Sequence, residues 1–515
     1  SNNTSVTTSS GTTATVDAEH LANGKTLDLD GGDNIVVNDA GTITVDASDD
    51  LGFDTNSNEL VGTLEVNAKS GADVDLDTGR SQTTFSGDAG TADIDATELR
   101  DNTLLTVKGS SDATVTSLIG DVDASNSSGV IDITSASDAG DDAASGDDDI
   151  DITAGSNDMR VRGTEGGGAE ITVDADAMNT GDQLTLGDQS DFVVSNVGSN
   201  VTVSGNGLTG LSEPDVPILD GTLVVTTDAG ATNVDVETGT ARTTVNTDST
   251  AGTAQSGSVT VDAAHLAQGD GDLTSGPLLG LTGRARFDVD NLVGDVDATA
   301  MDGGPLDVST NDAGDNGILI ALGDANASIQ TASGNTDTVE INAAGMTNAG
   351  SDTLKLGGGA ATIEVTNLVG NLDADGDLVG STSVGNTPFD GTLNVTTGLL
   401  DQSDGTEFVL GDGVTNITAN QDPSGDTSTG QTDLTIKAAA LDTEALSLSG
   451  DADIDVDDAS TNIDAASLTG ELDVDSESDS TFTLITGSGR TALTGASGST
   501  LTVNAAQLAQ DGTVS

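Results

Sequence analysis

The sequence predicts an all-β protein folded as a right-handed parallel β-helix, or β-solenoid, built from imperfect repeats of about 80 residues. Three observations predict it: short runs in which apolar and polar residues alternate, a motif that returns along the whole chain, and an aromatic content of 1%. In a solenoid, small aliphatic side chains stack into a narrow core, and Asp, Asn, Gly and Thr occupy the turns. The alternative is a row of tandem β-sandwich domains, whose cores usually contain Trp or Tyr.

An anchor motif marks the repeat: an apolar residue, Asp or Asn, Ala, two variable residues and a second apolar residue. The anchors begin at Val16, Ile94, Val173, Val261, Ile341 and Val503, and a variant with Lys begins at Ile436. Their spacings are 78, 79, 88, 80, 95 and 67 residues, with a mean of about 81. We therefore interpret residues 1–515 as one continuous repeat rod, with approximate repeats 16–93, 94–172, 173–260, 261–340, 341–435 and 436–502 and a partial repeat 503–515.

Within each repeat the pattern predicts several strands of four to six residues separated by Gly- and Asp-rich turns. Leu-x-Leu runs such as 27–29 and 446–448 follow the anchor, and a Leu-x-Gly step recurs at Leu60, Leu118, Leu292, Leu368 and Leu468. No stretch shows sustained helical periodicity. A period of about 81 residues predicts about four coils of ~20 residues per repeat.

The composition excludes several classes of protein. Thirteen Lys and Arg against 87 Asp and Glu give a net charge of −74, and Cys, Trp and Tyr are absent. Disulfides, thiol catalysis and Cys-ligated metals are excluded, and nucleic-acid binding is disfavoured because it needs basic and stacking side chains. The longest apolar run, 318–322, is too short to span a bilayer, so we expect no membrane insertion.

The segment 463–474, Ile-Asp-Ala-Ala-Ser-Leu-Thr-Gly-Glu-Leu-Asp-Val, resembles the strand repeats of bacterial surface-layer proteins and of large type I-secreted, RTX-like surface proteins. Segments 292–298 and 368–374 are similar. The resemblance implies a calcium-dependent, β-helical extracellular protein. It does not extend to tandem Gly-Gly-x-Gly-x-Asp nonapeptides, because the sequence contains no complete tandem of them.

Acidic turns are the candidate metal sites. Asp outnumbers Glu by 73 to 14, which favours turns and Ca²⁺ over a generic acidic surface. Gly-Asp turns can bring carboxylates and carbonyl groups together around a hard cation. The predicted Ca²⁺ ligands are Asp30, Asp33, Asp147, Asp149, Asp188, Asp191, Asp451 and Asp453. The alternative is that these residues cap turns and keep a solvated charge, as in adaptation to high salt.

The other chemically active residues do not suggest an enzyme. His20 and His265 share one repeat position, which other repeats fill with Glu, Ala, Gly or Gln, so a catalytic histidine is not expected. Five of the eight arginines fall 11 to 19 residues before an anchor: Arg80, Arg160, Arg162, Arg242 and Arg490. They are expected to form ion pairs, either within the same chain or with a neighbouring subunit.

These features favour a secreted, cell-surface structural protein that assembles with copies of itself into a surface layer or an extracellular fibre. The alternative is the stalk of a calcium-dependent adhesin, and a cell-surface polysaccharide is a further candidate partner. The last segment, 503–512, matches the segments that begin at Val16 and Val261 and stops where a Leu-x-Leu strand should follow. We therefore expect head-to-tail contacts between copies, unless the chain is part of a longer protein.

Overall fold

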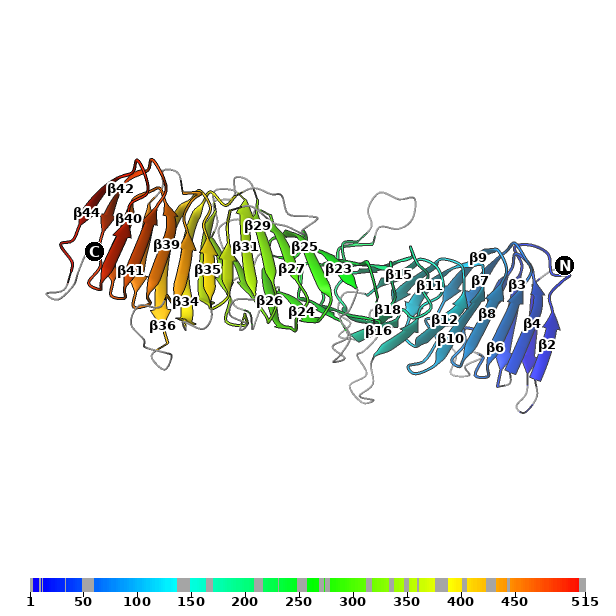
Figure 1. The fold of residues 1–515 in the computed structure, drawn as a ribbon. Coiled ribbons are helices and arrows are strands. Elements are labelled where there is room, and N and C mark those ends of the chain that lie inside the picture. Colours follow the sequence, from blue (N-terminus) through cyan, green and yellow to red (C-terminus); the bar gives the residue numbers. More distant parts are fainter. Residues whose placement is uncertain are drawn as a thin grey trace. The chain divides into compact units, whose positions relative to one another are not determined.

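The structure is a computed structural model that describes residues 3–8, 11, 13–32, 34–48, 60–136, 149–163, 170–207, 216–229, 231–247, 257–267, 273, 278–311, 317–332, 338–346, 352–358, 361–375, 388–400, 405–422, 432–441 and 445–508. Contacts divide the chain into two compact units, Ser1–Asp248 (unit 1) and Ser249–Ser515 (unit 2). The described residues of both units form strands, turns and bends (Figure 1). They include no helix of the length and apolarity needed to cross a membrane.

The strands of unit 1 are short and are joined by turns or loops. They are β1 (Thr4–Thr8), β2 (Thr13–Asp17), β3 (Thr26–Gly31), β4 (Asn34–Ala40), β5 (Thr44–Asp46), β6 (Leu64–Ala68), β7 (Ala72–Asp77), β8 (Thr83–Gly87), β9 (Gly90–Asp95), β10 (Leu104–Gly109), β11 (Asp112–Leu118), β12 (Asp121–Ser127), β13 (Ile131–Ser135), β14 (Ile150–Thr153), β15 (Met159–Arg162), β16 (Glu170–Asp174), β17 (Gln183–Gly187), β18 (Asp191–Val197), β19 (Thr202–Ser204), β20 (Leu223–Thr227), β21 (Val234–Glu237) and β22 (Thr243–Asn246).

Unit 2 has the same organisation. Its strands are β23 (Ser258–Asp262), β24 (Leu278–Gly283), β25 (Arg286–Leu292), β26 (Asp295–Met301), β27 (Leu306–Thr310), β28 (Ile318–Ala321), β29 (Ala327–Thr331), β30 (Thr338–Asn342), β31 (Thr353–Gly358), β32 (Thr362–Leu368), β33 (Asn371–Asp373), β34 (Thr392–Leu400), β35 (Thr406–Val409), β36 (Val414–Gln421), β37 (Leu434–Lys437), β38 (Leu446–Gly450), β39 (Ile454–Ala459), β40 (Ile463–Leu468), β41 (Leu472–Ser476), β42 (Thr481–Ile485), β43 (Thr491–Thr494) and β44 (Thr500–Asn504).

Within each unit a strand pairs in parallel with the strand two places further along the chain, as β3 does with β5 and β4 with β6. Odd-numbered strands therefore form one sheet and even-numbered strands the other, and one coil contains a strand from each. Stacked residues are 17 positions apart at the shortest, as in Leu105 on Val122, and 36 at the longest, as in Leu372 on Phe408. The predicted all-β parallel solenoid is confirmed, and the sandwich alternative, which requires antiparallel sheets, is wrong.

The core lies between the two sheets and consists of stacked aliphatic side chains. One column of the core runs through the odd-numbered strands from β5 to β13. It consists of Val45, Leu76, Ile94, Val115 and Ile133, stacked one above the next, and each is 1% exposed or less. The residues between them point outward, because successive side chains of a strand face opposite sides. Full burial of one such side chain contributes about 1.5–3 kcal/mol, so the stacked columns supply the main stabilisation.

The sequence repeat corresponds to seven strands. The seven anchors lie on β2, β9, β16, β23, β30, β37 and β44. The expectation of four coils per repeat is therefore wrong, since seven strands make three and a half coils. Long turns enlarge some coils well beyond the shortest one, so 81 residues hold fewer coils than predicted. Because seven is odd, successive anchors fall alternately on the even-numbered and odd-numbered sheets.

A β-bulge accompanies six of the seven anchors. Six strands, each stacked directly on an anchor strand, contain a left-handed residue with φ of 54° to 61°: Asp39, Ser117, Asn196, Asn291, Asn367 and Asp458. The pairing register shifts around each of them. Only Asp, Asn and Ser occupy this position, in keeping with the steric cost of a left-handed backbone for larger or branched residues.

The sequence suggested that the Leu-x-Gly step is one structural element, but the structure places it at two different positions of the repeat. Leu118, Leu292 and Leu368 end bulged strands, whereas Leu468 ends β40, the next strand of its repeat. Both places need glycine for the same reason: the chain turns tightly over the coil below. A Cβ atom on Gly470 would lie 2.0 Å from the carbonyl oxygen of Ala452. Similar turn geometry thus produced the same short motif at two positions of the repeat.

Candidate functional site

Among the predicted metal ligands of unit 1 that the structure describes, Asp30 and Asp149 lie at different strands, whereas Asp188 and Asp191 flank the short connection from β17 to β18. Asp30, at the end of β3, accepts a hydrogen bond from Thr7 Oγ1 at 3.3 Å. Asp191 accepts hydrogen bonds from the backbone nitrogen and Oγ1 of Thr222 at 2.7 and 2.8 Å. Asp149 is exposed just before β14, and Asp33 and Asp147 lie outside the described residues.

Asp188 has a backbone role. Its φ is 76°, and it follows a Leu-x-Leu run at a position that glycine fills in the other five complete repeats. These glycines are Gly31, Gly109, Gly283, Gly358 and Gly450, and all have positive φ. Asp tolerates this conformation better than most residues, because its short polar side chain can bond locally. The backbone conformation therefore explains why Asp occupies this turn position, without a metal ion.

In unit 2, the predicted ligands Asp451 and Asp453 also accept backbone hydrogen bonds. Asp451 Oδ1 accepts from the nitrogen of Gln421 at 2.9 Å, and Asp453 Oδ1 accepts from the nitrogen of Glu471 at 2.7 Å. In the described part of the chain, no three His, Cys, Asp or Glu residues come together in a group that could hold a metal ion. Calcium binding at the predicted turns stays a prediction.

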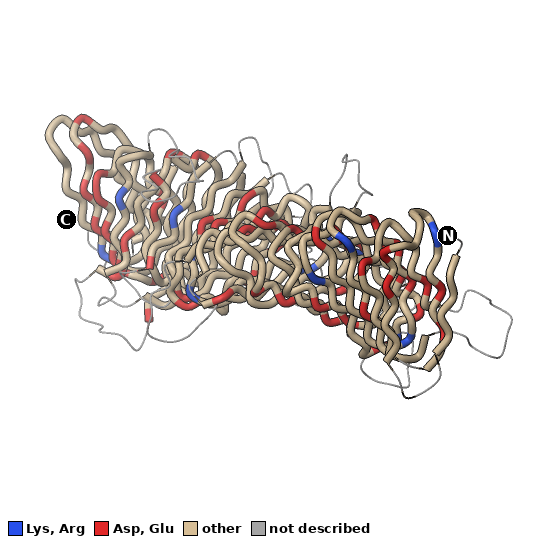
Figure 2. The backbone as a smooth tube through the Cα atoms, turned by 90° about the vertical axis from the view of Figure 1, so that its right-hand side faces the viewer, with Lys and Arg blue, Asp and Glu red and all other residues tan. Residues whose placement is uncertain are grey.

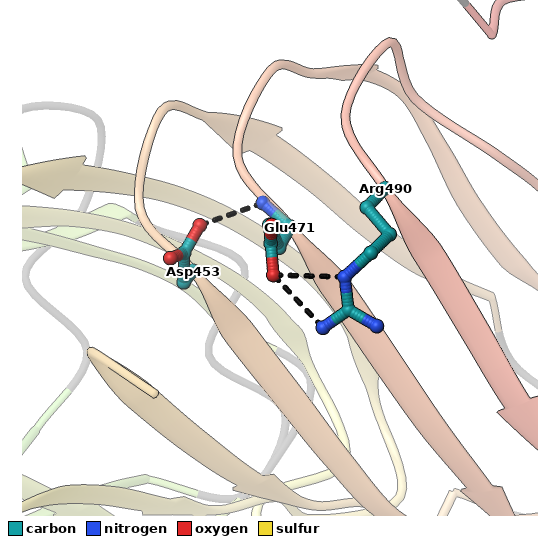
Figure 3. Close-up of polar contacts among 3 residues, drawn as sticks. All are labelled: Asp453, Glu471 and Arg490. Atoms are coloured by element: carbon teal, nitrogen blue, oxygen red, sulfur yellow. Dashed lines mark hydrogen bonds and ion pairs between the residues drawn. The ribbon is translucent and has the colours of Figure 1, made fainter. Parts of the chain in front are cut away.

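Asp453 belongs to a charged stack that we call the corner ladder: Asp433, Asp453, Glu471 and Arg490. Each precedes a strand of the odd-numbered sheet, from β37 to β43. The Asp453 nitrogen donates to Asp433 Oδ2 at 2.8 Å. Arg490 Nε and Nη2 both donate to Glu471 Oε2, at 3.0 and 2.8 Å, next to the Asp453 contact (Figure 3). Each acidic side chain thus finds a donor one coil further on.

Burial and neighbouring charges act in opposite directions in the corner ladder. Burial, followed by the negative charge of Glu471, raises the pKa of Asp453, while the Glu471 N–H and Arg490 oppose the rise. Both side chains of the Arg490–Glu471 pair stay partly exposed, at 44% and 27%. Solvent screening therefore limits what this pair contributes to stability.

The same coil-to-coil contact recurs throughout both units. At the start of a strand, an Asp or Asn side chain accepts the backbone N–H of the next coil, with distances of 2.7 to 3.1 Å. The acceptors are Asn34, Asp112, Asp121, Asp158, Asp191, Asp295, Asn326, Asn371, Asp433, Asp453 and Asn462. A short side chain suits this contact, which gives a structural reason for the excess of Asp over Glu.

An open pocket of about 410 Å³ lies over β2, β4 and β6 of unit 1. Its lining residues are Thr15, Asp17, Asn38, Asp39, Asn67 and Ala68. Asn67 Nδ2 donates to Asn38 Oδ1 at 3.0 Å, so two carboxamides are already joined in its wall. This pocket cannot be recognised in the sequence, because it depends on the bulge at Asp39 and on the stacking of three strands.

The pocket also marks an exception among the repeats. In repeats three, four and five, the bulge asparagine donates its amide to the anchor Asp or Asn: Asn196 to Asp174 at 3.0 Å, Asn291 to Asp262 at 3.2 Å and Asn367 to Asn342 at 3.1 Å. In the first repeat the equivalent residues are Asp39 and Asp17. Two ionised carboxylates cannot make this hydrogen bond.

Arg162 and Arg490, two of the five arginines selected from the sequence, form ion pairs within the chain, as one of the two interpretations predicted. Arg162 pairs with Asp132 at 2.9 Å and Arg490 with Glu471 at 2.8 Å, in each case between adjacent coils. His20 and His265 both lie in anchor turns, where His20 is exposed and His265 is half-buried. Asp and Glu are spread along the strands of both units, with few Lys and Arg among them (Figure 2).

Asp433 and Glu471 were not among the predicted site residues, although the sequence contains a signal for them. Asp433, Asp453, Glu471 and Arg490 are 20, 18 and 19 residues apart, close to one coil, and each of the three acidic residues precedes an apolar-x-apolar strand. No protein-family model, curated protein or solved structure matches the chain.

Proposed function

We propose that the chain is a secreted structural protein of the cell surface that assembles with copies of itself into a surface layer or an extracellular fibre, with Ca²⁺ as a stabilising ion. The observation that carries the proposal is the seven-strand repeat. The same anchor turn and bulge recur along both units, so the fold presents one repeated surface instead of a scaffold built around a single site. Such repetition suits an extended scaffold.

The use of the polar side chains supports the same function. The predicted ligands Asp191, Asp451 and Asp453 hold neighbouring coils together through backbone N–H groups. Hydrogen bonds to charged groups contribute about 1.5–3 kcal/mol each, so these side chains serve the strength of the scaffold. This use of polar side chains to join coils is expected of a structural protein.

The net charge supports a role for cations. A formal charge of −74 makes the folded state repel itself and other copies at low ionic strength. Cations that bind the folded chain stabilise it by mass action and reduce the repulsion between copies. Hard divalent ions suit surfaces rich in carboxylate oxygen.

Electron microscopy of the purified chain with and without Ca²⁺ tests the proposal. Sheets or filaments that form with Ca²⁺ and disperse with a chelator are the expected result. A matched ionic strength of NaCl serves as the control, because general screening would act equally in both salts. Particles that stay monomeric in Ca²⁺ would contradict self-assembly and favour the stalk of a calcium-dependent adhesin.

Polysaccharide binding is a second candidate function, favoured by the pocket over β2, β4 and β6. Carboxylates and carboxamides such as those of Asp17, Asp39 and Asn67 can bond sugar hydroxyls. Calorimetric titration with a purified cell-wall polysaccharide tests it, with Asn67→Ala as the weakened variant. Equal binding by the two proteins would remove the pocket from consideration.

A further inference from the structure

The pocket over the neighbouring strands β2, β4 and β6 contains two carboxylates, those of Asp17 and Asp39 (Figure 1). Asp17 Oδ1 accepts the Glu19 N–H at 3.0 Å. Among the described residues, no hydrogen bond reaches Oδ2 of Asp17 or either carboxylate oxygen of Asp39. An ionised carboxylate only accepts hydrogen bonds, so a ligand of this pocket has to supply donors.

The other repeats show which group belongs between the bulge and the anchor. In repeats three, four and five, the amide nitrogen of Asn196, Asn291 or Asn367 donates to the anchor residue at 3.0 to 3.2 Å. The first repeat has the same backbone there, because Asp39 has a φ of 54° and the pairing register shifts around it. Asp39 and Asp17 therefore occupy the same two places, without the nitrogen donor.

The sixth repeat shows what accompanies an aspartate at the bulge. Its bulge residue is Asp458, and its anchor contains Lys437 where the first repeat has Asp17. A hydrogen bond and the charge of Glu407, then the charges of Asp457 and Asp458, raise the pKa of Lys437. A protonated amine is thus within electrostatic reach of the bulge aspartate in this repeat.

The basic residue next to the pocket, Lys69, is directed elsewhere. It follows Ala68 of the lining, and its Nζ donates to the backbone carbonyl oxygen of Glu19 at 3.4 Å. In the described part of the chain it forms no ion pair with Asp17 or Asp39. The two carboxylates are therefore open to a cation that a ligand supplies.

We infer that this pocket binds a sugar unit that has a protonated amino group, such as glucosamine, and that Asp17 and Asp39 hold its ammonium group. The ammonium group takes the place of the asparagine amide in repeats three to five and donates to both carboxylates. Charge-assisted hydrogen bonds of this kind are about twice as strong as neutral ones. The inference rests on polysaccharide binding, the second proposed function, and names the class of sugar.

The size and the remaining lining of the pocket favour a sugar over a metal ion or a simple amine. Its volume of about 410 Å³ lies in the range typical of small-molecule pockets, about 300–1,000 Å³. The carboxamides of Asn38 and Asn67 and the hydroxyl of Thr15 can bond sugar hydroxyls. A carboxamide at the position of Asn67 is special to the first repeat, since the other five repeats have Thr134, Thr226, Ser309, Thr396 and Asp475 there.

Calorimetric titration of the full chain, dialysed against a chelator, tests the inference. The ligands are the glucosamine disaccharide of chitosan and its N-acetylated counterpart from chitin, which has the same rings and no charge. At about pH 6 the free amine is protonated, and physiological ionic strength screens the general attraction of a cation to an acidic protein. The charged disaccharide should bind at least on the order of tenfold more tightly than the neutral one.

Asp39→Asn is the critical variant, because asparagine is the natural bulge residue of repeats three to five and its amide can donate to Asp17. It should weaken binding of the glucosamine disaccharide by on the order of tenfold or more. Asp458→Asn is the matched control. It makes the same change of charge at the equivalent bulge of the sixth repeat and should leave the binding unchanged.

Three results would overturn the inference. One is an equal effect of Asp39→Asn and Asp458→Asn, and another is binding of butylamine as tight as that of the glucosamine disaccharide. The third is binding of the N-acetylated disaccharide alone, which would leave polysaccharide binding itself in place, whereas binding of neither sugar would contradict both. If Asp39→Asn does not fold, Asp17→Asn, which imitates Asn342, must show the loss for the inference to stand.

Discussion

The corner ladder of unit 2 and a column of in-register aspartates in unit 1 show two ways of stacking acidic residues on consecutive coils. The column consists of Asp28, Asp46, Asp77 and Asp95 on β3, β5, β7 and β9. In the ladder, Asp453 accepts the Glu471 N–H and Glu471 accepts from Arg490, so each acidic group meets a donor. In the column, Asp28, Asp46 and Asp77 stand in register with one another. Parallel stacking permits both arrangements. The difference shows that the residue one coil away determines the effect of an aspartate: a hydrogen-bond donor there stabilises the fold, whereas another aspartate adds like-charge repulsion.

The largest effect should come from the core beneath both regions. Leu76 lies between Asp75 and Asp77 on β7, and Leu472 lies between Glu471 and Asp473 on β41; they are 0% and 2% exposed. Leu76→Ala and Leu472→Ala should each reduce the free energy of unfolding by about 2–5 kcal/mol, through lost burial and a cavity. Urea unfolding measures this loss. A loss below about 1 kcal/mol would mean that the stacked core is not the main stabilising element.

A buried hydroxyl group allows the cost of burying an unpaired polar group to be measured separately from the cost of charge. Thr238 is fully buried, and its Oγ1 has no hydrogen-bond partner among the described residues. Other repeats place Ala154, Leu322 or Leu410 at this position. Thr238→Val should therefore stabilise the chain by about 1–2 kcal/mol, since it removes an unsatisfied polar group at similar volume. Thermal unfolding checks it, and a destabilised variant would point to a water molecule bound to the hydroxyl.

A like-charge pair can be introduced where the chain has a hydrogen bond. Asn196 donates to Asp174 at 3.0 Å, and Asn196→Asp recreates in the third repeat the Asp39 and Asp17 pair of the first. The variant should lose about 1 kcal/mol at pH 7 and low salt, because the donor is lost and two carboxylates face each other. The loss should shrink in high salt and at pH 4. Asn196→Ser, which imitates Ser117, is the control, and it should show no such salt dependence.

The smallest effect is expected at the end of the corner ladder. Arg490→Gln removes the cation that faces Glu471 and makes the ladder more like the column. Because the pair is partly exposed, the loss should be at most about 1 kcal/mol at low ionic strength, and it should vanish in 1 M NaCl. Chemical denaturation at the two salt concentrations measures it. A larger, salt-independent loss would show that Arg490 acts through packing of its side chain.

The sequence predicted the fold because alternation and repetition are local properties of the chain. Val, Ile and Leu at every second position predict strands, and seven recurring anchors predict a repeated architecture. The number of coils per repeat was wrong, because the sequence does not show which turns are tight and which carry long loops. Leu105 and Val122 stack across 17 residues, and Leu372 and Phe408 across 36.

The charged groups depend on the same unpredictable loops. Asp28, Asp46, Asp77 and Asp95 are 18, 31 and 18 residues apart, so their alignment in one column cannot be read from spacing. The corner ladder could have been found, because its members are almost evenly spaced. Asp188 was selected as a metal ligand for its Gly-Asp sequence, yet its left-handed backbone is a sufficient reason for that residue.

The odd number of strands in the repeat has a consequence for how a gene of this kind can lengthen. Duplication of one repeat inserts seven strands, or three and a half coils, and so moves every later strand of that unit into the opposite sheet. The insertion is compatible with the fold only because both sheets are built from the same strand types in alternation. Each unit therefore has an approximate twofold screw symmetry, in which one repeat is a half-turn and two repeats restore the original face.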